Sequence, residues 1–89
     1  MAVCRLVKTN ATPEEYDRVF EKVNSSGVST AGRTLHVAAV GEDGKIRVVE
    51  VWESRSDAEA LGEAVRNARE ELGIAEPASV SLLEVHNQV

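Results

Sequence analysis

Several residue types are scarce in this 89-residue chain, and each scarcity narrows the class of protein. A single cysteine excludes an internal disulfide and agrees with a reducing compartment. Ten Lys and Arg residues stand against fifteen Asp and Glu, without a basic cluster, which argues against a nucleic-acid partner. No apolar run has the length of a membrane span, and the N-terminus lacks the pattern of a signal peptide. We therefore expect a cytoplasmic protein without a membrane partner.

Aromatic residues make up only 3% of the chain, so Val, Ala and Leu must supply most of the core. The length fits one small domain, residues 1–89. A chain of this size buries only about 60–65% of the surface that its unfolded form exposes. Its core is therefore thin, and burial of a second face against a partner would add to it.

The apolar and polar patterns predict six elements in the order β-α-β-β-α-β. β-branched and apolar runs predict strands over residues 2–8, 34–40, 45–53 and 79–85. The tight Gly-Glu-Asp-Gly sequence at 41–44 predicts that the second and third strands form a hairpin.

Helix start and stop signals stand between these strands. Thr12 and Glu15 form a capping-box pattern at the start of the first helix. Ser56 and Glu59 form the same pattern for the second helix, which we expect to end at Gly73. In the first helix, four residues at helical spacing predict a core-facing stripe: Tyr16, Val19, Phe20 and Val23.

This order predicts an α+β, ferredoxin-like fold, in which a four-stranded antiparallel sheet carries both helices on one face. Right-handed connections place the strands at 2–8 and 45–53 in the centre of the sheet. The strands at 34–40 and 45–53 are apolar on both sides, although the helices cover only one. Because an apolar face must be covered, we expect a homodimer in which the sheets of two subunits pack together.

The hairpin segment TLHVAAVGEDGKIRVVEVWES at 34–54, followed by a capped helix, resembles the dimeric α/β-barrel superfamily, near its antibiotic-biosynthesis-monooxygenase-type domains. The motifs that carry the resemblance are LHVA at 35–38 and VWES at 51–54. The resemblance implies two ferredoxin-like subunits that pair into a dimeric α/β barrel, often with a ligand cavity. It also implies a range of activities, which includes cofactor-independent oxygenases, haem-degrading enzymes and isomerases.

The sequence argues against a haem or metal site. The haem-degrading branch uses an Asn near the first strand, a Trp, and a His on the second helix. Asn10 and Trp52 match the first two, but the predicted second helix contains no histidine. His36 and His86 are the only histidines, and neither stands in a cluster of Cys or acidic residues. We expect no metal and no cofactor.

The register of the hairpin decides which polar residues meet. If Val40 pairs with Lys45, His36 and Glu50 lie on opposite faces of the sheet. If Val40 pairs with Ile46, His36 lies directly opposite Glu50. We favour the second register, because it segregates the polar side chains better.

In the favoured register, the polar residues of the hairpin share one face of the sheet, and we expect this face to line the barrel. The residues on it are Thr34, His36, Val48, Glu50 and Trp52. The other face is left for the helices: Leu35, Val37, Ala39, Val49 and Val51. If the first strand presents Val3, Arg5 and Val7 to the barrel, Arg5 meets Glu50.

These residues support two interpretations. In the first, His36 is a catalytic general base in a half-apolar cavity, and Arg5, Glu50 and Trp52 form the substrate-binding wall. The protein is then a monooxygenase-like or isomerase-like enzyme that acts on a small apolar or aromatic metabolite. In the second, Arg5 and Glu50 form a structural ion pair, Trp52 fills the core, and the protein is a non-catalytic dimeric domain for small-molecule binding or assembly. The sequence leaves both open.

Overall fold

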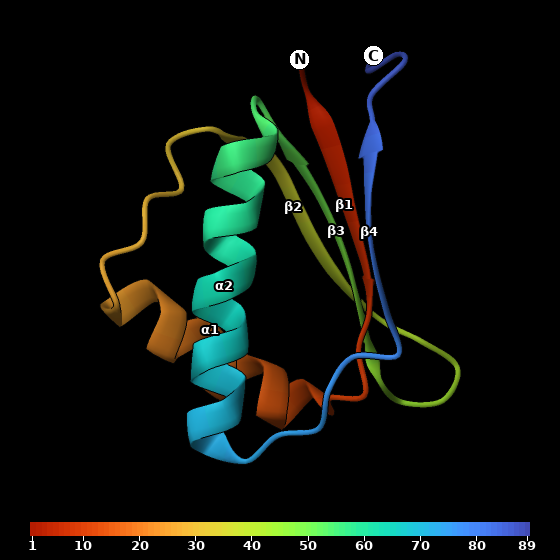
Figure 1. The fold of residues 1–89 in the computed structure, drawn as a ribbon. Helices are drawn as coiled ribbons and strands as arrows, with labels where there is room; N and C mark the ends of the chain where they lie inside the picture. Colours follow the sequence, from red (N-terminus) through yellow and green to blue (C-terminus); the bar gives the residue numbers. More distant parts are fainter.

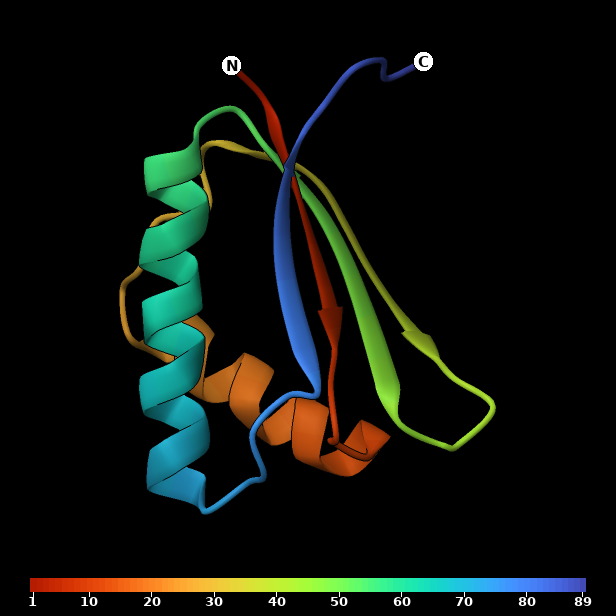
Figure 2. The ribbon, with the colours of Figure 1, turned by 45° about the vertical axis from the view of Figure 1, so that its right-hand side comes forward.

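A four-stranded antiparallel sheet carries two helices on one face (Figures 1 and 2). The computed structural model describes residues 1–89. The elements are β1 (Val3–Lys8), α1 (Pro13–Ser25), β2 (Arg33–Val40), β3 (Ile46–Trp52), α2 (Arg55–Leu72) and β4 (Ser79–Glu84). The strand order is β2-β3-β1-β4, so β1 and β3 are central. This confirms the predicted ferredoxin-like fold.

The start of α1 is as predicted, and the start of α2 is not. The Thr12 side chain accepts a hydrogen bond from the Glu15 backbone, while the Glu15 carboxylate accepts one from the Thr12 backbone. In α2 the N-cap is Ser54, whose hydroxyl accepts from the Asp57 backbone. The prediction that Ser56 begins this helix is wrong, because two Ser-x-x-acid patterns overlap here and the chain becomes helical at the first of them.

Gly73 ends α2 as predicted. Its φ of 69° lies in the left-handed region, and its N–H returns to the carbonyls of the last helical turn. Neither helix combines the length and the apolar character that a membrane span needs.

The hairpin has the favoured register. Val40 pairs with Ile46, and His36 lies opposite Glu50. An irregularity interrupts the pairing at the start of β2, where Arg33 faces Trp52 and the next paired residue is Leu35. Thr34 is therefore an extra, bulged residue without a partner in β3. The regular alternation that predicted it on the His36 face does not hold at this position.

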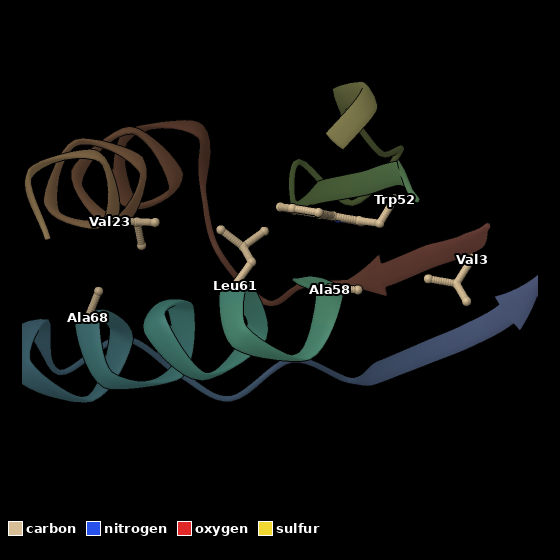
Figure 3. Packing of buried hydrophobic residues seen from close by; sticks show 6 residues of the cluster. All are labelled: Val3, Val23, Trp52, Ala58, Leu61 and Ala68. Carbon is tan, nitrogen blue, oxygen red and sulfur yellow. The ribbon is translucent and has the colours of Figure 1, made fainter. Parts of the chain in front are cut away.

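The prediction of which face the helices cover is wrong. The face that carries Arg5, His36, Glu50 and Trp52 lies against the helices and not in a barrel between subunits. Figure 3 shows the Trp52 ring packed towards α2 within the main core cluster, which comprises Val3, Val23, Trp52, Ala58, Leu61 and Ala68.

The opposite face, which we call the outer sheet face, presents side chains that are 38–51% exposed: Leu6, Leu35, Val37 and Leu83. The expectation that the helices cover this outer face came from the segregation of polar side chains in the favoured register. The one buried carboxylate beneath the helices, that of Glu50, is instead fully paired, as the next section describes.

Candidate functional site

Glu50 is the centre of a buried polar network. Its side chain is 1% exposed, and each carboxylate oxygen accepts two hydrogen bonds. Oε1 accepts from Arg5 Nη1 at 3.0 Å and from Trp52 Nε1 at 3.3 Å. Oε2 accepts from Arg33 Nη1 at 3.1 Å and from His36 Nδ1 at 2.7 Å. Because a carboxylate offers about four acceptor positions, Glu50 is saturated.

The network keeps Glu50 ionised. Burial acts to raise the pKa of this carboxyl, but the hydrogen bond from His36 and the charge of Arg5 outweigh it and hold the pKa below its usual range. An ionised carboxylate only accepts hydrogen bonds, so His36 Nδ1 must carry a proton. In a neutral imidazole the other ring nitrogen, Nε2, is then an acceptor.

Tyr16 completes a chain of three groups. Its hydroxyl oxygen lies 2.7 Å from His36 Nε2, and it donates its proton to that nitrogen when the imidazole is neutral. Burial, and then the charge of Glu50, raise the pKa of Tyr16, so its hydroxyl keeps its proton near neutral pH. A hydroxyl, an imidazole that accepts its proton, and a carboxylate that orients the imidazole form an acid–base relay.

The relay faces a cavity of about 600 Å³ between the sheet and the helices. This volume lies within the range of small-molecule sites. Fourteen of the 27 lining residues are hydrophobic, and the lining includes Tyr16, His36 and Glu50. The Phe20 ring, whose centroid lies 5.8 Å from that of Tyr16 and 5.9 Å from that of His36, extends this wall with a further aromatic surface.

The four residues predicted for the site come together around one carboxylate, although not all of them face the cavity. Arg5, His36 and Glu50 line it. Trp52 is completely buried and is not among the lining residues. Its indole N–H holds Glu50, and its ring lies 5.7 Å from the guanidinium carbon of Arg33, which is a cation–π distance.

Sequence reasoning missed two residues of the network. Tyr16 was assigned only to the core stripe, although a tyrosine hydroxyl in an apolar stripe needs a partner when it is buried. Arg33 is three residues from His36, and regular alternation would place the two on opposite faces. The bulge at Thr34 brings Arg33 to the His36 face, and nothing in the local sequence reveals that extra residue.

No group of three or more His, Cys, Asp and Glu side chains is arranged to hold a metal ion. Asn10, which matched the haem-degrading pattern, donates its side-chain amide to the Glu76 carbonyl at 2.7 Å.

These observations define the chain as a ferredoxin-like α+β domain with an internal cavity and a buried acid–base relay. No family model matches the sequence, and no curated protein matches it.

Solved structures with the same fold do match. A protein from Chloroflexus aurantiacus, provisionally called an antibiotic biosynthesis monooxygenase, aligns with a TM-score of 0.65 and 21% identity over 100% of this chain and 98% of its own. A protein of the same provisional name from Caulobacter crescentus aligns with a TM-score of 0.60 and 18% identity over 97% and 89%.

SnoaB from Streptomyces nogalater, a cofactor-independent oxygenase solved as a mutant, aligns with a TM-score of 0.60 and 16% identity over 99% and 94%. These likenesses confirm the fold of antibiotic-biosynthesis-monooxygenase-type proteins over nearly the whole chain.

Proposed function

We propose that this protein is a small enzyme that removes a proton from an apolar or aromatic metabolite bound in the cavity. The observation that carries the proposal is the Tyr16–His36–Glu50 relay, whose hydroxyl end lies on the cavity wall. A relay of this kind typically contributes 10²–10⁴-fold to a proton transfer.

The relay gives each residue one role. The Tyr16 oxygen accepts the proton of an acidic C–H or O–H group of the substrate while its own proton passes to His36 Nε2. Glu50 stays ionised and stabilises the imidazolium that forms, as the carboxylate of a catalytic triad does. The substrate is left as a carbanion or enolate, with its electron pair on carbon or oxygen.

Two reactions can follow from that intermediate. Return of the proton to a different carbon isomerises the substrate, and the protein is then an isomerase. Reaction of the carbanion with dioxygen gives an oxygenase, and the similar structure of SnoaB, a cofactor-independent oxygenase, supports this branch. Neither branch needs a metal or an organic cofactor in the cavity.

We further propose that the outer sheet face pairs two copies of the chain. Support comes from the partly exposed residues Leu6, Leu35, Val37 and Leu83, which the strand pairing places on one face of the sheet. No helix covers that face (Figure 2). The cavity lies on the other side of the sheet, so the proton-transfer site is complete within one chain.

Proton abstraction is tested with 2-tetralone, a two-ring aromatic ketone with an acidic CH2 group. Exchange of that CH2 group in D2O, followed by NMR, reports deprotonation whichever branch follows. We expect exchange above the buffer rate, and we expect His36→Gln or Tyr16→Phe to lower it by about 10²–10⁴-fold. Oxygen uptake measured in parallel separates an oxygenase from an isomerase.

The chain contains a matched control. His86→Gln makes the same substitution at the only other histidine, which lies exposed near the C-terminus, and should leave the exchange rate unchanged. A ketone that binds without exchange above the buffer rate would refute the enzymatic proposal. That result would favour the alternative of a non-catalytic binding domain. The complete pairing of Glu50 in the absence of a substrate agrees with this alternative.

A further inference from the structure

The cavity carries more positive than negative charge, although the protein as a whole has a formal charge of −5. Within the buried network, the two guanidinium groups of Arg5 and Arg33 share the single carboxylate of Glu50. Around the whole lining, four arginines (Arg5, Arg33, Arg66 and Arg69) oppose three glutamates (Glu50, Glu59 and Glu63). A positive site with low-dielectric walls in an acidic protein attracts anions selectively.

The buried Arg5 has donors to spare. Its side chain is 8% exposed, and its one hydrogen bond runs from Nη1 to Glu50. Glu50 is saturated and can accept nothing more. No fully buried side-chain nitrogen or oxygen lacks a partner, so the unused nitrogen atoms of Arg5 retain access to the cavity that this residue lines.

Gly62 on α2 leaves that side of Arg5 open. A Cβ atom built at Gly62 would lie 3.8 Å from Arg5 Nε and 4.0 Å from Nη2, the two nitrogens that Glu50 does not use. Gly62 also lines the cavity, so the absence of a side chain at this position leaves space beside the free edge of the guanidinium. A glycine inside a helix costs up to about 1 kcal/mol relative to Ala, and here a Cβ would lie in van der Waals contact with this edge of Arg5.

Arg33 has the same surplus of donors. It gives one hydrogen bond, from Nη1 to Glu50 Oε2, and its guanidinium is held near the Trp52 ring. Its side chain is 19% exposed and lines the cavity. Two arginines that are both fixed by Glu50, each with nitrogens still unpaired, form a preorganised site for anionic oxygens.

We infer that the natural ligand of the cavity is a small apolar or aromatic molecule with one carboxylate group, which docks on the free donors of Arg5 and Arg33. One negative charge neutralises the surplus guanidinium, and a planar carboxylate matches the geometry of a guanidinium. The apolar body of the molecule then lies against the aromatic wall formed by Tyr16, Phe20 and His36. This inference rests on the proposal that the cavity is the substrate site, and it names the class of substrate.

The test compares two probes of nearly equal shape, 1-naphthoate and 1-naphthamide, by isothermal titration calorimetry at low salt. We expect the charged probe to bind at least about tenfold more tightly than the neutral one, since hydrogen bonds to charged groups contribute about 1.5–3 kcal/mol. Arg33→Gln should weaken naphthoate binding by about tenfold or more and leave naphthamide binding nearly unchanged. Arg33 is the variant of choice because it is less buried than Arg5 and its replacement endangers folding less.

Arg55→Gln removes the same charge from an exposed position outside the cavity and should leave both affinities unchanged. Equal affinity for the two probes would overturn the inference of an anionic ligand, while the cavity would stand as a binding site. Failure of both probes to bind would overturn this inference together with the assignment of the cavity as a substrate site. An equal loss of both affinities in Arg33→Gln would also contradict it, because the arginine would then act only on the shape of the cavity.

Discussion

Glu50 shows how a charged side chain can be 1% exposed beneath two helices. Removal of a carboxylate from water costs several kcal/mol unless partners compensate it. Here four donors compensate it, two of them with full positive charges. The same saturation prevents Glu50 from acting as a base itself, so its contribution to chemistry must pass through His36.

Glu50→Gln tests this account through stability. The amide keeps the shape but leaves two arginines without a counter-charge, so we expect the free energy of unfolding at neutral pH to fall by about 3–5 kcal/mol. Because the folded-state pKa of Glu50 is depressed, the wild-type contribution is fully present above the usual value of 4.5 and is lost as the pH falls through the lower, folded-state value. Urea unfolding at a series of pH values should show that the unfolding free energies of the wild type and of Glu50→Gln converge in acid.

Glu53→Gln is the matched control, since Glu53 is exposed just beyond the end of the same strand. The free energy of unfolding of Glu53→Gln should stay close to that of the wild type at all pH values. A Glu50→Gln deficit that is constant from neutral pH into acid would contradict an ionised Glu50 as the source of the stability.

At the scale of single residues, the sequence allowed the meeting of Arg5, His36 and Glu50 to be predicted. Each lies in a regularly alternating stretch of strand, so the register alone decides its neighbours. The partners from outside such stretches were missed. Tyr16 comes from a helix whose position over the sheet depends on tertiary packing, and Arg33 precedes a bulge.

At the scale of elements, the start of α2 shows what a local pattern can and cannot decide. Ser54 and Ser56 both stand three residues before an acidic residue, so the pattern alone fits either. The structure selects Ser54, whose φ of −140° and ψ of 152° are those of an extended N-cap residue.

Ser54→Ala and Ser56→Ala form a matched pair. Loss of the cap should lower the free energy of unfolding by about 1 kcal/mol in Ser54→Ala, because the Asp57 N–H loses its acceptor. Ser56→Ala should change it by less than about 0.5 kcal/mol, as expected for an exposed substitution. Chemical denaturation measures both, and the reverse ranking would place the cap where the sequence first suggested it.

At the scale of the whole molecule, the βαββαβ order, the strand order and the presence of two apolar sheet faces could all be predicted from the sequence. It did not decide which face the helices cover. The sequence analysis assigned the polar face to a partner. Only the structure shows that the Glu50 carboxylate of this face is fully paired beneath the helices. The face that the helices leave uncovered is the more uniformly apolar one, with Leu35 40% and Val37 45% exposed.

The proposed homodimer is tested with two valines of the same strand. Val37 lies on the outer sheet face, and Val40, three residues later in the regular part of β2, points to the opposite side and is 63% exposed. We expect the wild type to sediment as a dimer at micromolar concentration and Val37→Lys to shift it towards the monomer, because a buried, unpaired charge opposes association. Val40→Lys should remain dimeric. A wild-type monomer would contradict the dimer proposal.

The placement of the network along the chain also has a consequence for how the protein folds. Three of the four donors to Glu50 come from the hairpin of β2 and β3, at sequence separations of 17, 14 and 2 residues, whereas Arg5 lies 45 residues away. Closure of a short loop costs less entropy than closure of a long one, so local contacts can form early. We therefore expect the carboxylate to gain most of its partners when the hairpin closes, and the docking of β1 to add the last.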